Sequence, residues 1–225
     1  MAGRKKATHE AVQETVAQDS MIGVSIPPID IRYLEVEIVG DSPLIIHAWS
    51  EKAKREMLDK QMKKATKGKD AKDPWREYVD ALYWISEKPE NPTQADIDNG
   101  RFGFPAVAFK ASAIDAAFQQ GVIAKKTTMR GAFHIVEEFV EIIGKPTMRE
   151  DMVRVGGISK VADIRYRPEF KEWRARFTVR YNSTAITPEQ ILNAINIGGF
   201  ANGLGEWRPS RDGSYGTYHV RRNGE

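Results

Sequence analysis

The order of the predicted strands and helices indicates an α+β protein built on a ferredoxin-like split βαβ core. Hydrophobic patterns predict strands at 31–39, 133–143, 172–181 and 215–221, and helices at 109–120 and 188–197. The resulting order, strand–helix–strand–strand–helix–strand, is the split βαβ arrangement. Two stretches interrupt it: residues 44–105, expected to form a mainly helical insertion, and residues 146–168, expected to form a basic, thumb-like β-hairpin insertion.

The first strand separates its side chains into two faces. Leu34, Val36 and Ile38 alternate with Tyr33, Glu35 and Glu37. A period of two is typical of a strand with one buried face. The apolar set is therefore expected to face the core.

The insertion at 44–105 contains two helix signals. A lysine-rich helix is expected to follow Ser50, and a second begins at Pro74, where apolar and aromatic residues recur at spacings of three and four. Residues 86–100 are rich in proline and asparagine and are expected to form a loop.

The middle of the chain supplies the first core helix and a basic connector. The helix at 109–120 should end at Gly121, a residue that favours the left-handed conformation after a helix. Residues 125–130 (KKTTMR) then form a short connector to the strand at 133–143. Its cations, Lys125, Lys126 and Arg130, are candidates for binding phosphate.

The second insertion has a hairpin pattern. Two short extended pieces, 152–155 and 161–166, flank Gly156-Gly157. The cations on this predicted hairpin are Arg154, Lys160, Arg165 and Arg167.

The third strand alternates arginine with apolar residues. In a split βαβ sheet it lies beside the first strand, so Glu35 and Glu37 are expected to form cross-strand ion pairs with Arg174 and Arg176. These two arginines are therefore weaker candidates for ligand binding than the arginines of the hairpin.

The second core helix has a well-defined start. Thr187, Pro188 and Gln190 are the cap, the first-turn proline and the capping-box residue. Gly198-Gly199 is expected to end the helix.

The loop between this helix and the last strand is the most informative segment. Residues 198–216 contain six glycines, together with Trp207, Arg208 and Arg211. Glycines such as Gly203 and Gly205 allow backbone amides to approach phosphates, while tryptophan can stack on bases and arginine binds phosphate oxygens. The same pattern also fits a long turn in which Trp207 covers the core.

Composition and charge bound the remaining possibilities. The 225 residues suit one elaborated domain at 21–225, preceded by a disordered basic tail at 1–20. There is no cysteine, and neither a signal peptide nor a membrane span is recognisable, so a cytoplasmic protein is expected. The net charge is only +3, but residues 145–225 contain fourteen Lys/Arg against nine Asp/Glu. Such patches attract polyanions, and they are also common on ordinary solvated surfaces.

A helix, a glycine-rich loop and a final strand on a ferredoxin-like core resemble the RAMP superfamily, the repeat-associated proteins of CRISPR systems. The resemblance covers residues 31–221 as topology and 187–220 as motif. It is closest to a backbone subunit of a CRISPR effector complex, or to a phage or mobile-element relative, although this chain is shorter than the larger backbone subunits. The resemblance implies binding of RNA or single-stranded DNA, by side-by-side copies or within a larger nucleoprotein complex.

The expected function is therefore non-catalytic binding of RNA or single-stranded DNA, without metal or cofactor. Two alternatives stay open: a RAMP-like, metal-independent endoribonuclease that uses a histidine, and a structural assembly subunit. The four histidines, His9, His47, His134 and His219, show no zinc-ligand spacing, and nothing marks one of them as catalytic.

Overall fold

The protein is described by a computed structural model that covers residues 28–64, 71–155 and 161–222. The predicted tail at 1–20, Gly156-Gly157 and Lys160 lie outside these residues. Residues 31–225 cluster as one compact unit, separate from residues 1–30.

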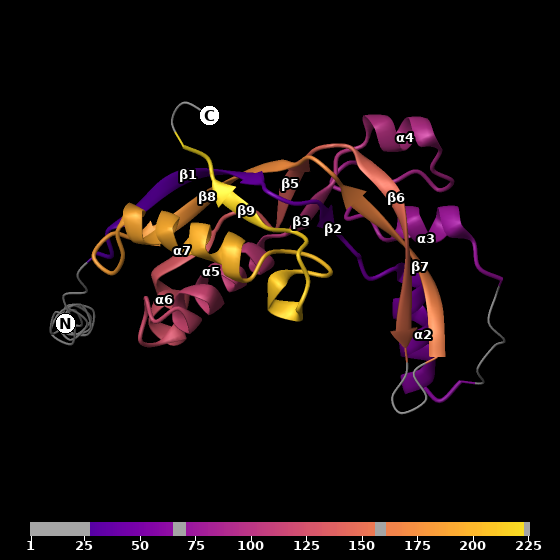
Figure 1. Ribbon diagram of the computed structural model, residues 1–225, viewed down its shortest axis with the longest axis horizontal. Coiled ribbons are helices and arrows are strands. Elements are labelled where there is room, and N and C mark those ends of the chain that lie inside the picture. Colours follow the sequence, from indigo (N-terminus) through magenta and orange to yellow (C-terminus); the bar gives the residue numbers. More distant parts are fainter. Residues whose placement is uncertain (1–27, 65–70, 156–160, 223–225) are drawn as a thin grey trace, which may run out of the picture. The chain divides into compact units, whose positions relative to one another are not determined.

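The central sheet has the predicted split βαβ topology, which confirms the α+β fold (Figure 1). Its strand order is β3-β5-β8-β1-β9, every pair is antiparallel, and β4 also pairs with β8. The strands are β1 (Ile31–Gly40), β3 (Gly103–Pro105), β4 (Phe133–Ile135), β5 (Phe139–Ile143), β8 (Arg174–Asn182) and β9 (Tyr218–Val220).

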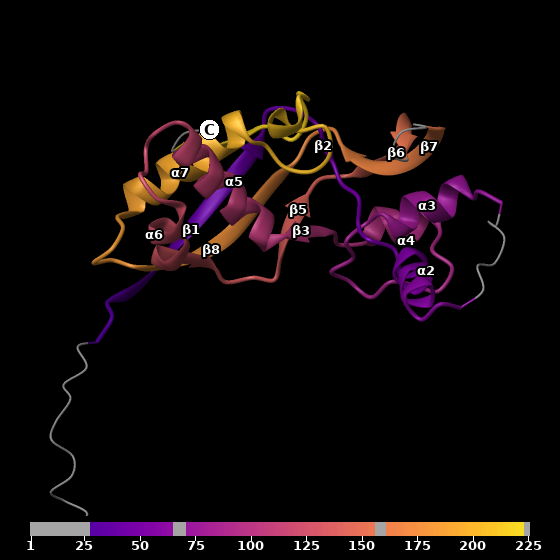
Figure 2. The ribbon, with the colours of Figure 1, turned by 90° about the horizontal axis from the view of Figure 1, so that it is seen from below.

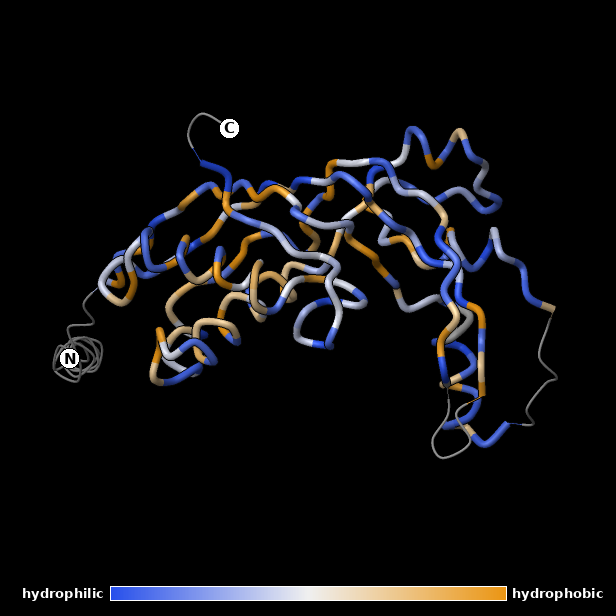
Figure 3. The backbone as a smooth tube through the Cα atoms, viewed as in Figure 1, coloured by the Kyte–Doolittle hydropathy of each residue, from blue (hydrophilic) through white to orange (hydrophobic). Residues whose placement is uncertain are grey.

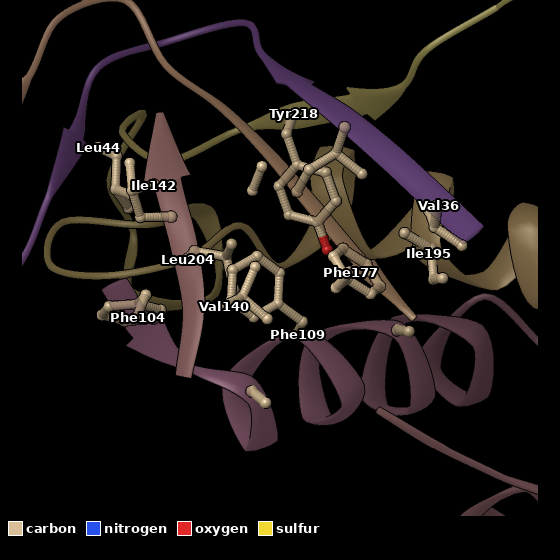
Figure 4. Packing of buried hydrophobic residues seen from close by; sticks show 14 of the residues in the cluster. Val36, Leu44, Phe104, Phe109, Val140, Ile142, Phe177, Ile195, Leu204 and Tyr218 are labelled. Carbon is tan, nitrogen blue, oxygen red and sulfur yellow. The ribbon is translucent and has the colours of Figure 1, made fainter. Parts of the chain in front are cut away.

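Two helices, α5 (Ala106–Gln119) and α7 (Pro188–Ala201), pack against each other and cover one face of this sheet (Figure 2). Val36 and Ile38 of β1 point into the resulting core, as their alternation predicts. Phe109 and Ile195 reach it from the two helices (Figure 4). The apolar and polar segments of the chain are mapped in Figure 3.

The helix α7 does not end at Gly198-Gly199, contrary to the sequence prediction. It continues to Ala201, and both glycines are buried. A Cβ atom at Gly198 would lie 2.9 Å from the Ala113 Cα of α5, and one at Gly199 would overlap the Tyr218 carbonyl oxygen. These glycines therefore allow close packing, and tertiary contacts outweigh their poor helix propensity.

Three other elements differ from the sequence predictions. Most residues of the predicted short connector at 125–130 instead belong to the helix α6 (Lys126–Ala132). Residues 133–143 form two strands, β4 and β5; the Glu137 carboxylate accepts a hydrogen bond from the Thr178 amide at 2.9 Å where the strand is interrupted. The predicted loop at 86–100 contains the helix α4 (Gln94–Asn99), which has a Thr93–Asp96 capping box.

The two insertions together form a second, three-stranded sheet, and helix α3 packs against it. The first contains β2 (Leu44–Ile45), α2 (Glu51–Gln61), α3 (Pro74–Asp80) and α4. The hairpin is longer than predicted and consists of β6 (Pro146–Val155) and β7 (Val161–Phe170), with β2 pairing against β7. The α3 helix contacts the hairpin, and the Tyr78 hydroxyl donates to the Pro146 carbonyl at 3.1 Å.

Candidate nucleic-acid interface

The loop after α7 is held by backbone hydrogen bonds, both within the loop and to residues 43–45. The Leu204 amide donates to the Gly216 carbonyl at 2.9 Å, and the Gly216 amide donates to Pro43 at 2.8 Å. The Glu206 amide donates to Ile45 at 2.8 Å, which fixes the loop against β2. Many of the amides that the sequence suggested for phosphate binding are therefore used inside the protein.

The glycines of this loop serve conformation and packing. Gly203 and Gly205 have φ values of 66° and 72°, in the left-handed region. A Cβ atom at Gly205 would overlap the Ile45 carbonyl oxygen. The glycine-rich composition thus explains how the loop closes.

Trp207 is held by this loop in an unusual conformation. Its φ is 52°, a region that bulky residues rarely adopt, and the side chain is 41% exposed. The Trp207 carbonyl accepts from the Tyr215 amide at 3.0 Å, and the neighbouring Arg208 donates to the Gly205 carbonyl at 2.7 Å. The surrounding hydrogen bonds hold a strained backbone that leaves an indole at the surface.

Arg208 and Arg211 differ in availability. Arg208 also donates to the Ser210 hydroxyl at 3.0 Å, so its guanidinium is largely used in holding the loop. Arg211 is exposed and has no ion pair within the described part of the chain. Arg211 is therefore the freer of the two cations beside Trp207.

The hairpin base contacts this loop through an arginine that the sequence analysis did not single out. The Arg149 guanidinium lies 4.8 Å from the centre of the Tyr215 ring and pairs with Asp151 at 2.8 Å and Glu169 at 2.7 Å. The signal that could have found it is its register opposite Arg167, since two facing arginines require carboxylates nearby.

The predicted cations of the hairpin lie in different surroundings. Arg167 is buried between Asp151 at 3.6 Å and Glu206 at 3.9 Å, and Arg165 pairs with Asp163 at 2.9 Å. Arg154 is exposed and has no ion pair among the described residues. Of the described candidates on the hairpin, Arg154 has the side chain most accessible to a ligand.

The cations of α6 lie at the other end of the sheet. Lys125 is exposed, Lys126 pairs with Asp115 at 2.9 Å, and Arg130 is exposed. The strand β4 that follows pairs with residues 179–181 of β8, whereas the loop packs where β1 ends. The structure therefore divides the predicted site residues into two groups, one on and beside α6 and the other on the hairpin and the loop after α7.

The open face of the sheet has a mixed charge. Glu37 pairs with Arg176 and with Arg221, both at 2.9 Å, and hydrogen bonds from these arginines hold the pKa of Glu37 below its ordinary value. The predicted pair for Arg176 is confirmed. The prediction for Arg174 is wrong, because the register places Arg174 opposite Val39.

The described histidines are separated. Partial burial and the nearby Arg167 lower the pKa of His47. The ring of His134 lies 3.2 Å from the Lys110 amine, and His219 contacts Asp41 at 2.6 Å. Across residues 28–64, 71–155 and 161–222, no group of three or more His, Cys, Asp or Glu side chains is arranged to hold a metal ion.

No family model matches the sequence, and no curated protein matches it. Comparison with solved structures finds similar chains at low sequence identity. One is Cmr6 from Pyrococcus furiosus, with 9% identity and a TM-score of 0.43, covering 86% of this chain and 100% of that one. Another is a chain of the type III-B Cmr-beta complex bound to cognate target RNA, with 13% identity and a TM-score of 0.43, covering 95% of this chain and 63% of that one.

Among the described helices, none is long and apolar enough to cross a membrane. Residence in the cytoplasm stays a prediction.

Proposed function

We propose that this protein binds RNA or single-stranded DNA without cleaving it. Trp207 carries the proposal, because the loop presents a large aromatic ring at the surface at the cost of a left-handed backbone. A strained backbone of this kind costs about 1–3 kcal/mol and clusters at ligand-binding positions. Stacking of one base on an aromatic side chain contributes about the same, roughly 1–3 kcal/mol.

The charges around the indole suit a polynucleotide. Arg211 is available beside it, and Arg154 is available on the hairpin. Arginine binds phosphate oxygens through a planar fork, which complements an aromatic platform for the base. Binding to phosphates also makes the affinity fall steeply with salt.

The test compares wild type, Trp207→Phe and Trp207→Gly by fluorescence anisotropy with a labelled single-stranded oligonucleotide. Glycine suits the left-handed backbone, so Trp207→Gly removes the ring and relieves the backbone strain at this position. Binding should weaken about tenfold for Trp207→Gly and little for Trp207→Phe. Absence of binding by wild type at low salt would overturn the proposal. Unchanged affinity of Trp207→Gly would show that Trp207 does not contact the oligonucleotide.

One contact favours a second candidate function, cleavage of RNA by a histidine. The 2.6 Å contact between His219 Nδ1 and the Asp41 carboxylate orients the imidazole in the manner of a general base. Incubation of wild type with labelled RNA should yield no discrete products if the protein only binds. Products that disappear in His219→Gln would instead establish the nuclease.

We also propose that copies lie side by side along the strand. Apolar side chains are exposed on two separate elements: Met152 and Ile164 on the hairpin, and Phe200, 81% exposed, on α7. If one patch of a copy contacts a different patch of the next copy, the contact can repeat. The copies then form an open array, unless the rotation between neighbours closes them into a ring. Sedimentation with and without an oligonucleotide long enough for several copies tests this; a single bound copy at saturation would contradict it.

A further inference from the structure

A second group of basic side chains meets at the edge of the sheet where β4 pairs with β8. The Lys110 amine of α5 donates to the Arg130 carbonyl at 2.7 Å and lies 3.2 Å from His134 Nδ1. His134 is directly opposite Arg180 in the β4–β8 register. Helix α5 and strand β8 therefore bring basic side chains to one histidine, and Arg130 of α6 lies next to Lys110.

No carboxylate balances this group. Within the described residues, Lys110, Arg130 and Arg180 take part in no ion pair. The pKa of His134 is lowered by partial desolvation and then by the charges of Lys110 and Arg180, and the pKa of Lys110 is lowered by burial and by Arg130. Like charges held together repel one another, and an anion placed among them would remove that repulsion.

An aromatic ring lies beside Arg180 on the open face of the sheet. Arg180 is directly opposite Tyr33 of β1, whose side chain is 64% exposed. His134, Arg180 and Tyr33 thus form a row across three neighbouring strands. The row combines positive charge with a ring that can stack on a base.

The same strand contains a natural contrast. Arg176 and Arg180 lie on the same face of β8, because four residues separate them. Arg176 is bonded to Glu37, whereas Arg180 faces His134 and Tyr33. The charge of Arg176 is therefore paired with a carboxylate, whereas that of Arg180 is not paired with one in the described part of the chain.

We propose that Lys110, Arg130, His134 and Arg180 form a binding site for a phosphate group. The inference rests on the proposed function, since the phosphate is then one in the backbone of the bound single strand, with Tyr33 stacked on an adjacent base. From Tyr33 to Gly40, where β1 ends near the Trp207 loop, is about 23 Å at roughly 3.3 Å per residue. The strand would thus be held at two separate points of the molecule.

The first test measures the salt dependence of oligonucleotide binding for the double variant Lys110→Gln/Arg180→Gln. Loss of one phosphate contact should lower the slope of log K against log salt by about 0.7 for a single strand. Binding at low salt should weaken about tenfold. Arg176→Gln is the matched control, because it removes one arginine from the same face and leaves Glu37 paired with Arg221. A double variant with the slope and affinity of wild type would overturn the inference.

The second test uses inorganic phosphate and NMR of the His134 ring, assigned with the variant His134→Gln. Phosphate bound at this site should raise the pKa of His134, whereas sodium chloride of matched ionic strength should not. An unchanged pKa overturns the phosphate site and leaves the proposed function standing if wild type still binds single strands. A raised pKa in a protein that binds no single strand supports the phosphate site and overturns the proposed function.

Discussion

The hairpin base and the far edge of the sheet are both rich in basic residues, yet their charges are arranged in opposite ways. At the hairpin base, Arg149, Arg165 and Arg167 each lie within 4 Å of a carboxylate. At the sheet edge, Lys110 and Arg180 approach His134 with no carboxylate between them. Paired charges hold two segments together, whereas unpaired charges remain available to a ligand. The number of arginines in a segment therefore says little about where a polyanion binds.

The largest effect is expected from breaking the paired region. Arg167→Ala should lower the free energy of unfolding by about 2 kcal/mol, because it removes a buried arginine and leaves the buried Asp151 with Arg149 as its one ion-pair partner among the described residues. Urea unfolding measures the change. Arg180→Ala at the sheet edge should shift stability by no more than about 0.5 kcal/mol. An equal loss of unfolding free energy in the two variants would contradict the view that only the hairpin arginines stabilise the fold.

A smaller effect is expected from acid at the cross-strand pair. The pKa of Glu37 is lowered in the folded protein by Arg176 and Arg221, so its contribution to stability is present above the unfolded value of 4.5. It is lost as the pH falls through the lowered, folded value. Melting temperatures between about pH 5 and 3 should fall less steeply for Glu37→Gln than for wild type. Parallel curves would show that the pair does not stabilise the fold.

The smallest effect is expected from the unpaired group. The pKa of His134 in the folded protein lies below 6.5, the value for the unfolded chain, so the unfolded chain binds the proton more readily. The free energy of unfolding therefore falls as the pH drops from 6.5 towards the pKa of the folded protein. In phosphate-free buffer, His134→Gln should reduce this loss. His47→Gln is a necessary companion, because the pKa of His47 is lowered as well. If His134→Gln leaves the pH profile unchanged, the cations do not act on this histidine.

The order of core elements was predictable because it follows from local patterns. The alternation in β1 and the Thr187 cap of α7 each depend only on residues close together in the sequence, and both are confirmed. The role of Gly198 and Gly199 was not predictable, since it depends on Ala113 and Tyr218, which are distant in sequence. The low helix propensity of glycine favours ending α7 at these residues, but their packing against α5 and β9 favours continuing the helix.

The candidate site was less predictable than the fold. A list of arginines does not show that Arg167 is buried between carboxylates while Arg154 is exposed. Nor does it show that Lys110 and Arg180 meet at His134, because this grouping requires the β4–β8 register and the packing of α5. Trp207 was identified from its neighbours in the sequence, but its left-handed backbone appears only in the fold.

The position of β1 has a consequence for the synthesis of the chain. Both of its neighbours in the sheet, β8 and β9, come from the C-terminal part of the chain. At about 5–20 residues per second, the ribosome needs roughly 10–40 s to reach Tyr218 after it has made Ile38. Until β8 is made, β1 has neither partner, and until β9 is made one of its edges stays open; an apolar face with open edges favours aggregation. The nascent protein should therefore depend on chaperones until its last strand emerges.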